Sequence, residues 1–345
     1  MRDKKVDPDT FVRPAGVDPA ATLTVVRVPA EWARWRVDRV VVATFTRMSR
    51  TRAQKVVRAG AFAEHGKPLR PNDRVGAGDV ILLYRPPFEE PDLPTDLPIL
   101  YEDDALLAVD KPSGLPVHPT ARYHHRTVTA VLAARRPTER LGLCHRIDRE
   151  TSGVLLLAKD LPAERFVKRA LEERGVVTKT YLCITWGVIE PSCGRIEHAL
   201  KLDEQGRLRV KMRVGDGEAD ALSAATRYEV LEARTSRVTG QAYALVRCDL
   251  ETGRQHQIRA HLSARGTPIV GDKLYAGARG LDEEVFMRAS DGLLTDEDRE
   301  RLELPRHALH AHRLALPNPR RPDEIIGITS ELPEDLVEFW EALKT

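Results

Sequence analysis

An aspartate between two arginines is the sequence feature best suited to chemistry. Asp148 lies between Arg146 and Arg149, three residues after His145. Because nearby positive charge lowers the pKa of a carboxylic acid, we expect the Asp148 carboxyl to be ionised at neutral pH. An ionised carboxylate suits nucleophilic attack better than proton donation. The alternative is a surface ion pair beside a structural turn, which charged loops often contain.

A buried strand and a glycine turn must position this aspartate. The apolar run at residues 154–158, Val-Leu-Leu-Leu-Ala, predicts a buried strand. The charged residues before it therefore lie at the mouth of a core element. Gly153 gives the backbone the freedom to turn into the strand.

Three motifs resemble those of one family of RNA enzymes. Residues 145–160, HRIDRETSGVLLLAKD, are similar to the signature of the RluA-type RNA pseudouridine synthases. Residues 253–275, GRQHQIRAHLSARGTPIVGDKLY, resemble the second signature of that family, and residues 179–181, followed by Gly187, resemble its Lys-x-Tyr strand. The matches follow the family's order over most of residues 95–330. The resemblance implies an isomerase that converts uridines in structured RNA to pseudouridine, with no cofactor and no metal.

The same resemblance implies roles for individual residues. Asp148 is the expected nucleophile, and attack on the sugar, attack on the base and assistance of elimination stay open. Tyr181 is expected to stack on the uracil, and Arg259 to orient Asp148 through an ion pair. A uridine inside folded RNA must be flipped out, which costs a few kcal/mol. The residues expected to bind substrate are Arg146, which would fill the vacated space, Ile258, an apolar wall, and His145, Arg254 and His256.

Composition is that of an ordinary soluble globular protein. The chain is 42% hydrophobic and 31% charged. Its 345 residues are long enough for about two domains. The net charge of +2 means that any RNA is held by local patches. The four cysteines form no C-x-x-C pair, and no apolar run predicts a signal peptide or a membrane span. We expect a cytoplasmic monomer without an obligate protein partner or membrane contact.

The chain divides into four predicted segments. Residues 1–24 contain three prolines and no periodicity, which predicts a flexible arm. Residues 25–85 are expected to form a small α+β module, with helices predicted by Val37, Val40 and Val41 and by a start at Ser49. The proline-rich residues 86–98 predict an extended linker. The catalytic domain is expected at residues 99–345.

The small module is locally basic. Between residues 27 and 85 there are thirteen Lys or Arg residues against five Asp or Glu residues. The pattern resembles the alpha-L RNA-binding module of ribosomal small-subunit protein four, although four charges on a helix can also be only a solvated face. The residues expected to bind RNA are Arg50, Arg52, Lys55, Arg58 and Lys67.

The catalytic domain is predicted to be α+β, with a mixed, largely antiparallel sheet and a central cleft. Strand-like runs predominate, and neither a regular βαβ alternation nor a glycine-rich phosphate loop is present. The predicted strands are 99–101, 106–109, 178–188, 222–231, 242–250 and 309–316, and the predicted helices are 127–134, 164–173 and 334–343. Residues 281–304 hold nine acidic residues against three basic residues, which favours a solvent-facing insertion over a lid.

Other functions stay open from the sequence alone. A metal-dependent hydrolase could use His145 with Asp148, or His310 with His312, but neither pair has a third ligand at a typical spacing. A nucleoside glycosidase would need a second carboxylate near the reacting bond. An inactive RNA-binding assembly factor is a third alternative. Among RNA targets, the resemblance of the extra module to a known RNA-binding module favours large-subunit ribosomal RNA over transfer RNA.

Overall fold

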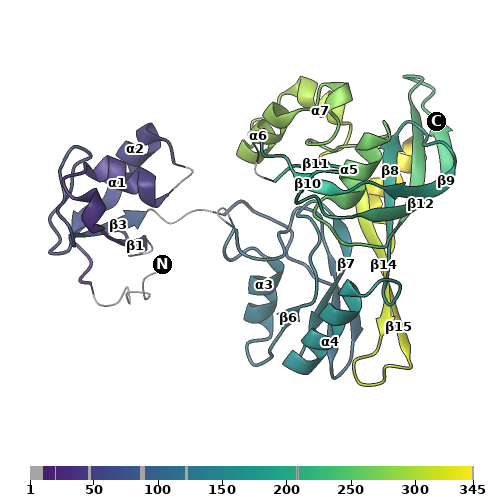
Figure 1. Ribbon diagram of the computed structural model, residues 1–345, viewed down its shortest axis with the longest axis horizontal. Helices are drawn as coiled ribbons and strands as arrows, with labels where there is room; N and C mark the ends of the chain where they lie inside the picture. The colour runs from purple at the N-terminus through teal and green to yellow at the C-terminus, as the bar shows by residue number, and fades with distance from the viewer. Residues whose placement is uncertain are drawn as a thin grey trace. The chain divides into compact units, whose positions relative to one another are not determined.

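The computed structural model describes residues 11–19, 21–45, 48–85, 90–120, 123–206, 208 and 210–343. The chain forms two compact units, residues 1–89 and residues 90–345 (Figure 1). The division falls inside the stretch of residues 86–98 that the proline content predicted as a linker. Each unit has its own hydrophobic core.

The first unit is a three-stranded antiparallel sheet covered by two helices. The strand order is β1-β3-β2. Alternate residues of β3 face opposite sides, so that Ile81 and Leu83 pack against α1 and α2 while Leu82 faces away. Both helices that the valine spacing and Ser49 predicted are present. The bounds are β1 (Thr22–Arg27), α1 (Val37–Thr44), α2 (Arg50–Gly60), β2 (Ala61–Ala63) and β3 (Val80–Arg85).

Residues 11–19 and 21–24 do not form the flexible arm that the prolines predicted. Strand β1 begins at Thr22, and Phe11 and Val17 pack on the sheet face that the helices leave open. Arg13 lies over the ring of Tyr84, 5.1 Å from its centroid, and donates to the Asp18 carbonyl at 2.6 Å. The first unit therefore includes these residues, because apolar side chains from this segment cover the second face of the sheet. Residues 1–10 of the predicted arm lie outside the described part.

A ten-stranded mixed sheet organises the second unit (Figure 1). The main order is β4-β5-β7-β14-β8-β13-β12-β9, with β6 paired to β7 and β15 paired to β14. Among the described strand pairs only β7 and β14 run parallel, which confirms the largely antiparallel α+β prediction. The bounds are β4 (Ile99–Glu102), β5 (Leu106–Lys111), β6 (Gly142–Leu143), β7 (Ser152–Ala158), β8 (Thr178–Trp186), β9 (Cys193–Glu197), β12 (Ala225–Thr235), β13 (Ala242–Leu250), β14 (Leu309–Pro317) and β15 (Ile325–Thr329).

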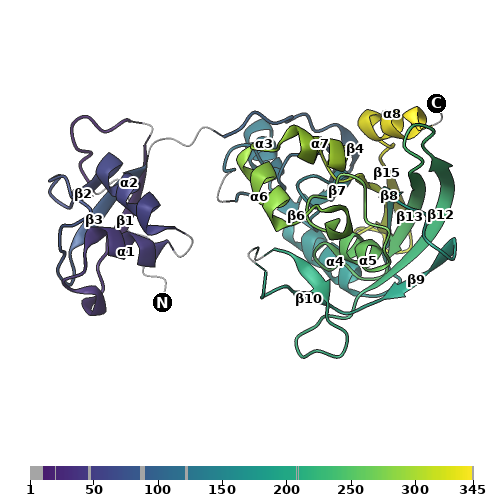
Figure 2. The same cartoon turned by 90° about the horizontal axis from the view of Figure 1, so that it is seen from above.

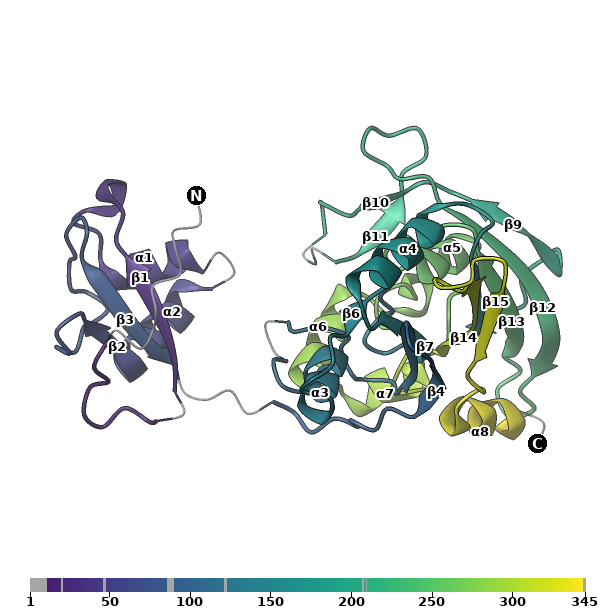
Figure 3. The same ribbon diagram turned by 90° about the horizontal axis from the view of Figure 1, so that it is seen from below.

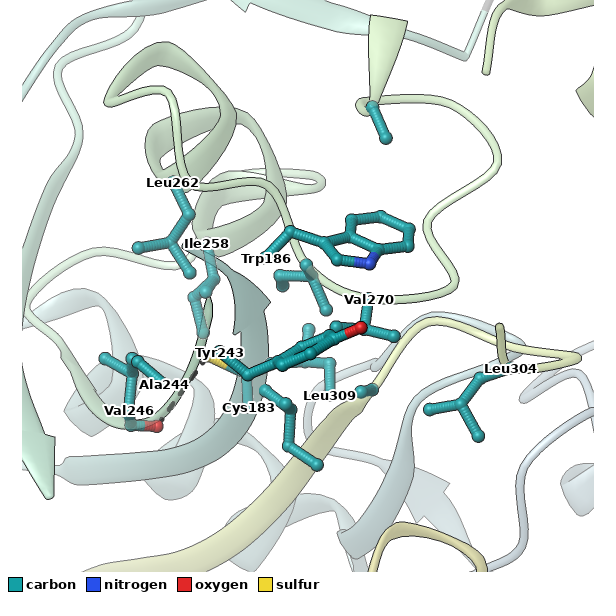
Figure 4. Packing of buried hydrophobic residues seen from close by; sticks show 14 of the residues in the cluster. Cys183, Trp186, Tyr243, Ala244, Val246, Ile258, Leu262, Val270, Leu304 and Leu309 are labelled. Carbon is teal, nitrogen blue, oxygen red and sulfur yellow. Dashed lines mark hydrogen bonds between the residues drawn. The ribbon is translucent and has the colours of Figure 1, made fainter. Parts of the chain in front are cut away.

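Helices cover this sheet and enclose its cores. The end of the sheet formed by β13, β12 and β9 curves around α5 (Figures 2 and 3). Figure 4 shows Ile258 and Leu262 of α5 in one cluster with Cys183 of β8 and Val246 of β13. The helices are α3 (Val128–Arg135), α4 (Leu161–Glu172), α5 (Gln257–Ala264), α6 (Glu283–Asp291), α7 (Asp296–Leu302) and α8 (Glu334–Ala342), and a small hairpin joins β10 (Leu200–Leu202) to β11 (Met212–Val214).

The described part of the predicted linker is docked on the second unit. The Glu90 carboxylate accepts backbone N–H groups of His124, His125 and Arg126 at 2.5–2.7 Å. Leu97 is buried in the same core as α3. Residues 90–98 therefore belong to the second unit rather than to an extended spacer. Residues 86–89 lie outside the described part.

The acidic stretch of residues 281–304 is only partly solvent-facing. It forms α6 and α7, and α7 begins at the capping box of Thr295. Its inner face is apolar, since Leu281, Val285 and Leu302 are buried in the main core. None of the residues 281–304, all of which the structure describes, lines the cavity beside Asp148, so they do not form a lid over it.

Candidate functional site

Asp148 lies at a cavity of about 280 Å³. Most of the lining comes from three parts of the second unit: the loop before β7, Tyr181 of β8, and residues 253–259, which include the first turn of α5. Leu250 at the end of β13 also lines the cavity. Leu309 at the start of β14 adds an apolar contact. The Asp148 side chain is 22% exposed, so a substrate group can reach it.

Backbone contacts from several elements hold the loop that carries Asp148. The Thr151 N–H donates to the Asp148 carbonyl at 3.2 Å, just before β7 begins. Gly153 has φ +106°, and a Cβ there would lie 2.3 Å from the carbonyl oxygen of Ala311 on the parallel strand β14. Lys111, fully buried at the end of β5, donates to the Arg149 carbonyl at 2.9 Å. The sheet centre therefore fixes this loop.

Arg259 joins Asp148 to a second, deeper carboxylate. Its Nη1 donates to Asp148 Oδ2 at 2.9 Å, while Nε and Nη2 donate to the two oxygens of Asp272 at 2.7 and 2.9 Å. Asp272 is fully buried and also accepts the backbone N–H groups of Leu274 and Tyr275 at 2.9 and 3.0 Å. Such two-point contact fixes a guanidinium in one orientation.

The charges around Asp148 keep it ionised. Burial by itself raises the pKa of the Asp148 carboxyl, but the interactions of the carboxylate with His256 and Arg259 outweigh burial and lower that pKa. Burial also lowers the pKa of His256 to about 4, so this imidazole is neutral at pH 7 and Arg259 is the permanent cation. Oδ2 is held by Arg259, whereas Oδ1 has no hydrogen-bond partner within the described residues. Oδ1 is therefore free to act as a nucleophile or a base.

Tyr181 and Ile258 form the uncharged part of the cavity wall. Burial and the charge of Asp148 raise the pKa of the Tyr181 phenol above its usual value, so the phenol stays protonated. Ile258 is buried and joins the cavity to the main core. The flat ring of Tyr181 and the apolar surface of Ile258 suit contact with a planar base.

The other predicted substrate residues divide between the cavity and the fold. Arg146, Arg254 and His256 line the cavity, and Arg254 also donates to the Ser223 carbonyl at 3.1 Å. His145 does not line it. Instead, its Nε2 accepts the backbone N–H of Leu156 at 3.1 Å, and burial lowers the pKa of His145 to about 4. His145 supports β7 because the segment before it runs beside that strand, where the Cys144 N–H donates to the Leu156 carbonyl at 3.2 Å.

The sequence interpretation missed Asp272 and Tyr275. Both lie in the second motif, residues 253–275, but neither has a local feature that separates it from an ordinary turn residue. A possible signal was the Gly271-Asp272 pair after the apolar run, which is typical of a turn that uses the aspartate side chain. Their contacts with Arg259 and His256 require the tertiary fold.

The structure does not support a metal site or a second catalytic carboxylate within the described residues. His310 Nδ1 contacts Ser152 Oγ at 3.0 Å, and both His310 and His312 contact the carbonyl of Ser330. Among the described residues, no group of three or more His, Cys, Asp or Glu side chains is placed to hold a metal ion. The carboxylate that adjoins Asp148, Asp272, is fully buried and lies outside the cavity lining.

The basic residues of the first unit lie on the outer side of α2 and beside β2. Arg50, Arg52, Lys55, Arg58 and Lys67 are all exposed. Arg50 also lies 3.5 Å from the buried carboxylate of Asp38. The opposite side of α2 carries Ala53 and Val57, which pack in the core. Of the helices in the described ranges, none is long and apolar enough to cross a membrane.

Comparisons with known proteins identify the family of this chain. The RNA pseudouridylate synthase family model matches residues 105–264, a range that contains Asp148, Tyr181 and Arg259. The ribosomal large subunit pseudouridine synthase D of Xanthomonas campestris is 35% identical, over 92% of this chain and 91% of that relative. The protein of the same name from Neisseria meningitidis serogroup B is 33% identical, over 92% of this chain and 81% of that relative.

A solved structure has the same fold. Human RNA pseudouridylate synthase domain containing 4 is 30% identical with a TM-score of 0.54, over 71% of this chain and 92% of that chain. The chain therefore belongs to the RNA pseudouridine synthase family and is an isomerase that forms pseudouridine in RNA.

Proposed function

We propose that this isomerase uses Asp148 as its nucleophile on uridines flipped out of large-subunit ribosomal RNA. The observation that carries the proposal is an ionised carboxylate at an open cavity, with Oδ2 held by Arg259 and Oδ1 free. A group held in this way has little freedom to lose when the substrate arrives, which favours the reaction.

The chemistry breaks one bond to the base and forms another. The C1′–N1 glycosidic bond breaks, the uracil turns, a C1′–C5 bond forms, the C5 proton leaves and N1 takes up a proton. Asp148 Oδ1 can begin this sequence by attack on the sugar, by attack on the ring or by assisting elimination. Tyr181 stacks on the detached base, and Arg146 at the rim fills the space that the flipped nucleotide leaves.

The RNA target is inferred from the relatives and from the first unit. Two relatives, at 33% and 35% identity, are named for the large ribosomal subunit. The exposed cations of α2 suit contact with phosphates, and we assign the first unit to RNA binding. The protein would then act in the cytoplasm as a monomer, without an obligate partner. Transfer RNA is the alternative substrate.

Pseudouridine mapping of total RNA tests this assignment. Cells that lack the gene are compared with cells that carry it back as wild type or as Asp148→Asn. We expect specific pseudouridines in large-subunit ribosomal RNA to vanish on deletion and to return only with wild type. Loss confined to transfer RNA would select the alternative substrate, and an unchanged map would favour an inactive binding factor.

A further inference from the structure

A hydrogen-bond chain beside the active site fixes the proton of His256. The hydroxyl of Tyr275 accepts the backbone N–H of Met212 at 2.7 Å and lies 2.9 Å from His256 Nδ1. A tyrosine hydroxyl has one proton to donate. Since Tyr275 is buried, leaving that proton without an acceptor is costly, and Nδ1 is the acceptor within reach. His256 Nδ1 is therefore unprotonated, and Nε2 carries the hydrogen of the neutral ring.

This Nε2–H group points at an open position. Its neighbour, Asp148 Oδ1, lies 3.8 Å away, beyond hydrogen-bond distance, and Nε2 has no closer partner in the described part of the chain. The His256 side chain is 13% exposed and lines the cavity. The cavity therefore contains a neutral donor that is directed by Tyr275 and left without an acceptor.

We propose that His256 Nε2–H donates a hydrogen bond to a carbonyl oxygen of the flipped uracil. The inference rests on the proposed function, because it places the base in the Asp148 cavity. Uracil offers two carbonyl oxygens as acceptors, whereas cytosine presents an amino group in place of one of them. A buried donor that meets an amino group stays unpaired, so the contact selects for uracil if it involves that position. A neutral ring also leaves the negative charge of Asp148 undiminished.

The backbone at His256 provides a discriminating pair of variants. His256 has φ +53°, a left-handed conformation that asparagine tolerates better than glutamine. The amide nitrogen of glutamine can reach the position of Nε2, whereas that of asparagine reaches only the position of Nδ1. A purely structural role therefore predicts that His256→Asn is the milder change, and a donor role predicts that His256→Gln is the milder change.

The assay is single-turnover release of tritium from C5 of uridine in unmodified large-subunit ribosomal RNA transcripts. We expect His256→Gln to stay within about 10-fold of wild type and His256→Asn to lose roughly 100-fold, the size expected for a lost hydrogen bond in a desolvated site. RNA binding by filter retention should be the same for both. An asparagine variant as fast as the glutamine variant, or faster, overturns the proposal.

A second experiment uses only wild-type enzyme, so its result does not depend on whether a variant folds. Sulfur accepts hydrogen bonds poorly, so wild-type enzyme is given RNA in which tritiated 2-thiouridine or 4-thiouridine replaces uridine. We expect one of the two to react at least about 10-fold more slowly, and to identify the carbonyl that is bound. Equal rates for uridine and both thiouridines overturn the proposal. Wild-type enzyme that releases no tritium from any of these RNAs contradicts the proposed function instead.

Discussion

Replacing Asp272 by asparagine tests whether a buried carboxylate orients the active-site arginine. The change keeps the shape but removes the charge and one of the two acceptors that Arg259 uses at 2.7 and 2.9 Å. Because breaking a buried ion pair typically costs about 3–5 kcal/mol, we expect the free energy of unfolding at pH 7 to fall by about 3 kcal/mol. With Arg259 less constrained, tritium release should fall roughly 10- to 100-fold while RNA affinity stays unchanged.

The pH dependence of the free energy of unfolding provides a further test of the role of Asp272. Burial raises the pKa of the Asp272 carboxyl, but Arg259 outweighs burial and lowers it. The stability that Asp272 contributes is therefore present above the unfolded pKa, about 3.9, and is lost as pH falls through the lower folded pKa. The wild-type advantage should shrink in acid. Removing the Asp272 charge also lowers the pKa of Asp148 further, so the acid limb of activity should move to lower pH.

Asp298→Asn is a matched control. Asp298 is 4% exposed and binds Arg288 through two hydrogen bonds of 2.7 and 2.8 Å, but it lies in α7 and does not line the cavity. Denaturant unfolding and single-turnover tritium release are measured for both variants. We expect Asp298→Asn to lose stability without losing rate. If Asp272→Asn keeps the wild-type rate, Asp272 does not orient Arg259.

Two further changes probe the loop and the histidine. Gly153→Ala should cost several kcal/mol of stability in thermal or denaturant unfolding, because the new Cβ would lie 2.3 Å from the Ala311 carbonyl at a φ of +106°; a wild-type unfolding curve would contradict the close packing of β7 on β14. Since the pKa of His256 is about 4, tritium release should stay level from pH 8 to pH 5, and a twofold fall already at pH 6.5 would show that a histidine of ordinary pKa controls the rate.

Sequence patterns predicted the elements that bury apolar residues. Val37, Val40 and Val41 repeat at helical spacing, and α1 forms there because that stripe covers the sheet. The apolar run before Lys159 became β7 at the sheet centre, with Asp148 just before it. Short strands such as β9 escaped prediction because an edge strand with four exposed residues of five has no apolar alternation.

Contacts between distant residues were beyond sequence reasoning. Asp148 and Arg259 were paired through the family resemblance, but Asp272 became part of the site only when the fold placed it behind Arg259. His145 looked like a site residue because it is close to Asp148 in sequence, yet its imidazole supports β7. Nearness along the chain does not determine which side chain faces a cavity.

The most direct test of the catalytic role of Asp148 is single-turnover tritium release by Asp148→Asn enzyme bound to its RNA. Asp104→Asn, at a side chain that is 75% exposed, serves as the control variant. We expect Asp148→Asn to stay folded and to bind RNA but to release no tritium, while Asp104→Asn releases it at the wild-type rate. Release by folded Asp148→Asn enzyme within tenfold of wild type, a barrier change of only about 1.4 kcal/mol, would contradict the central role of Asp148.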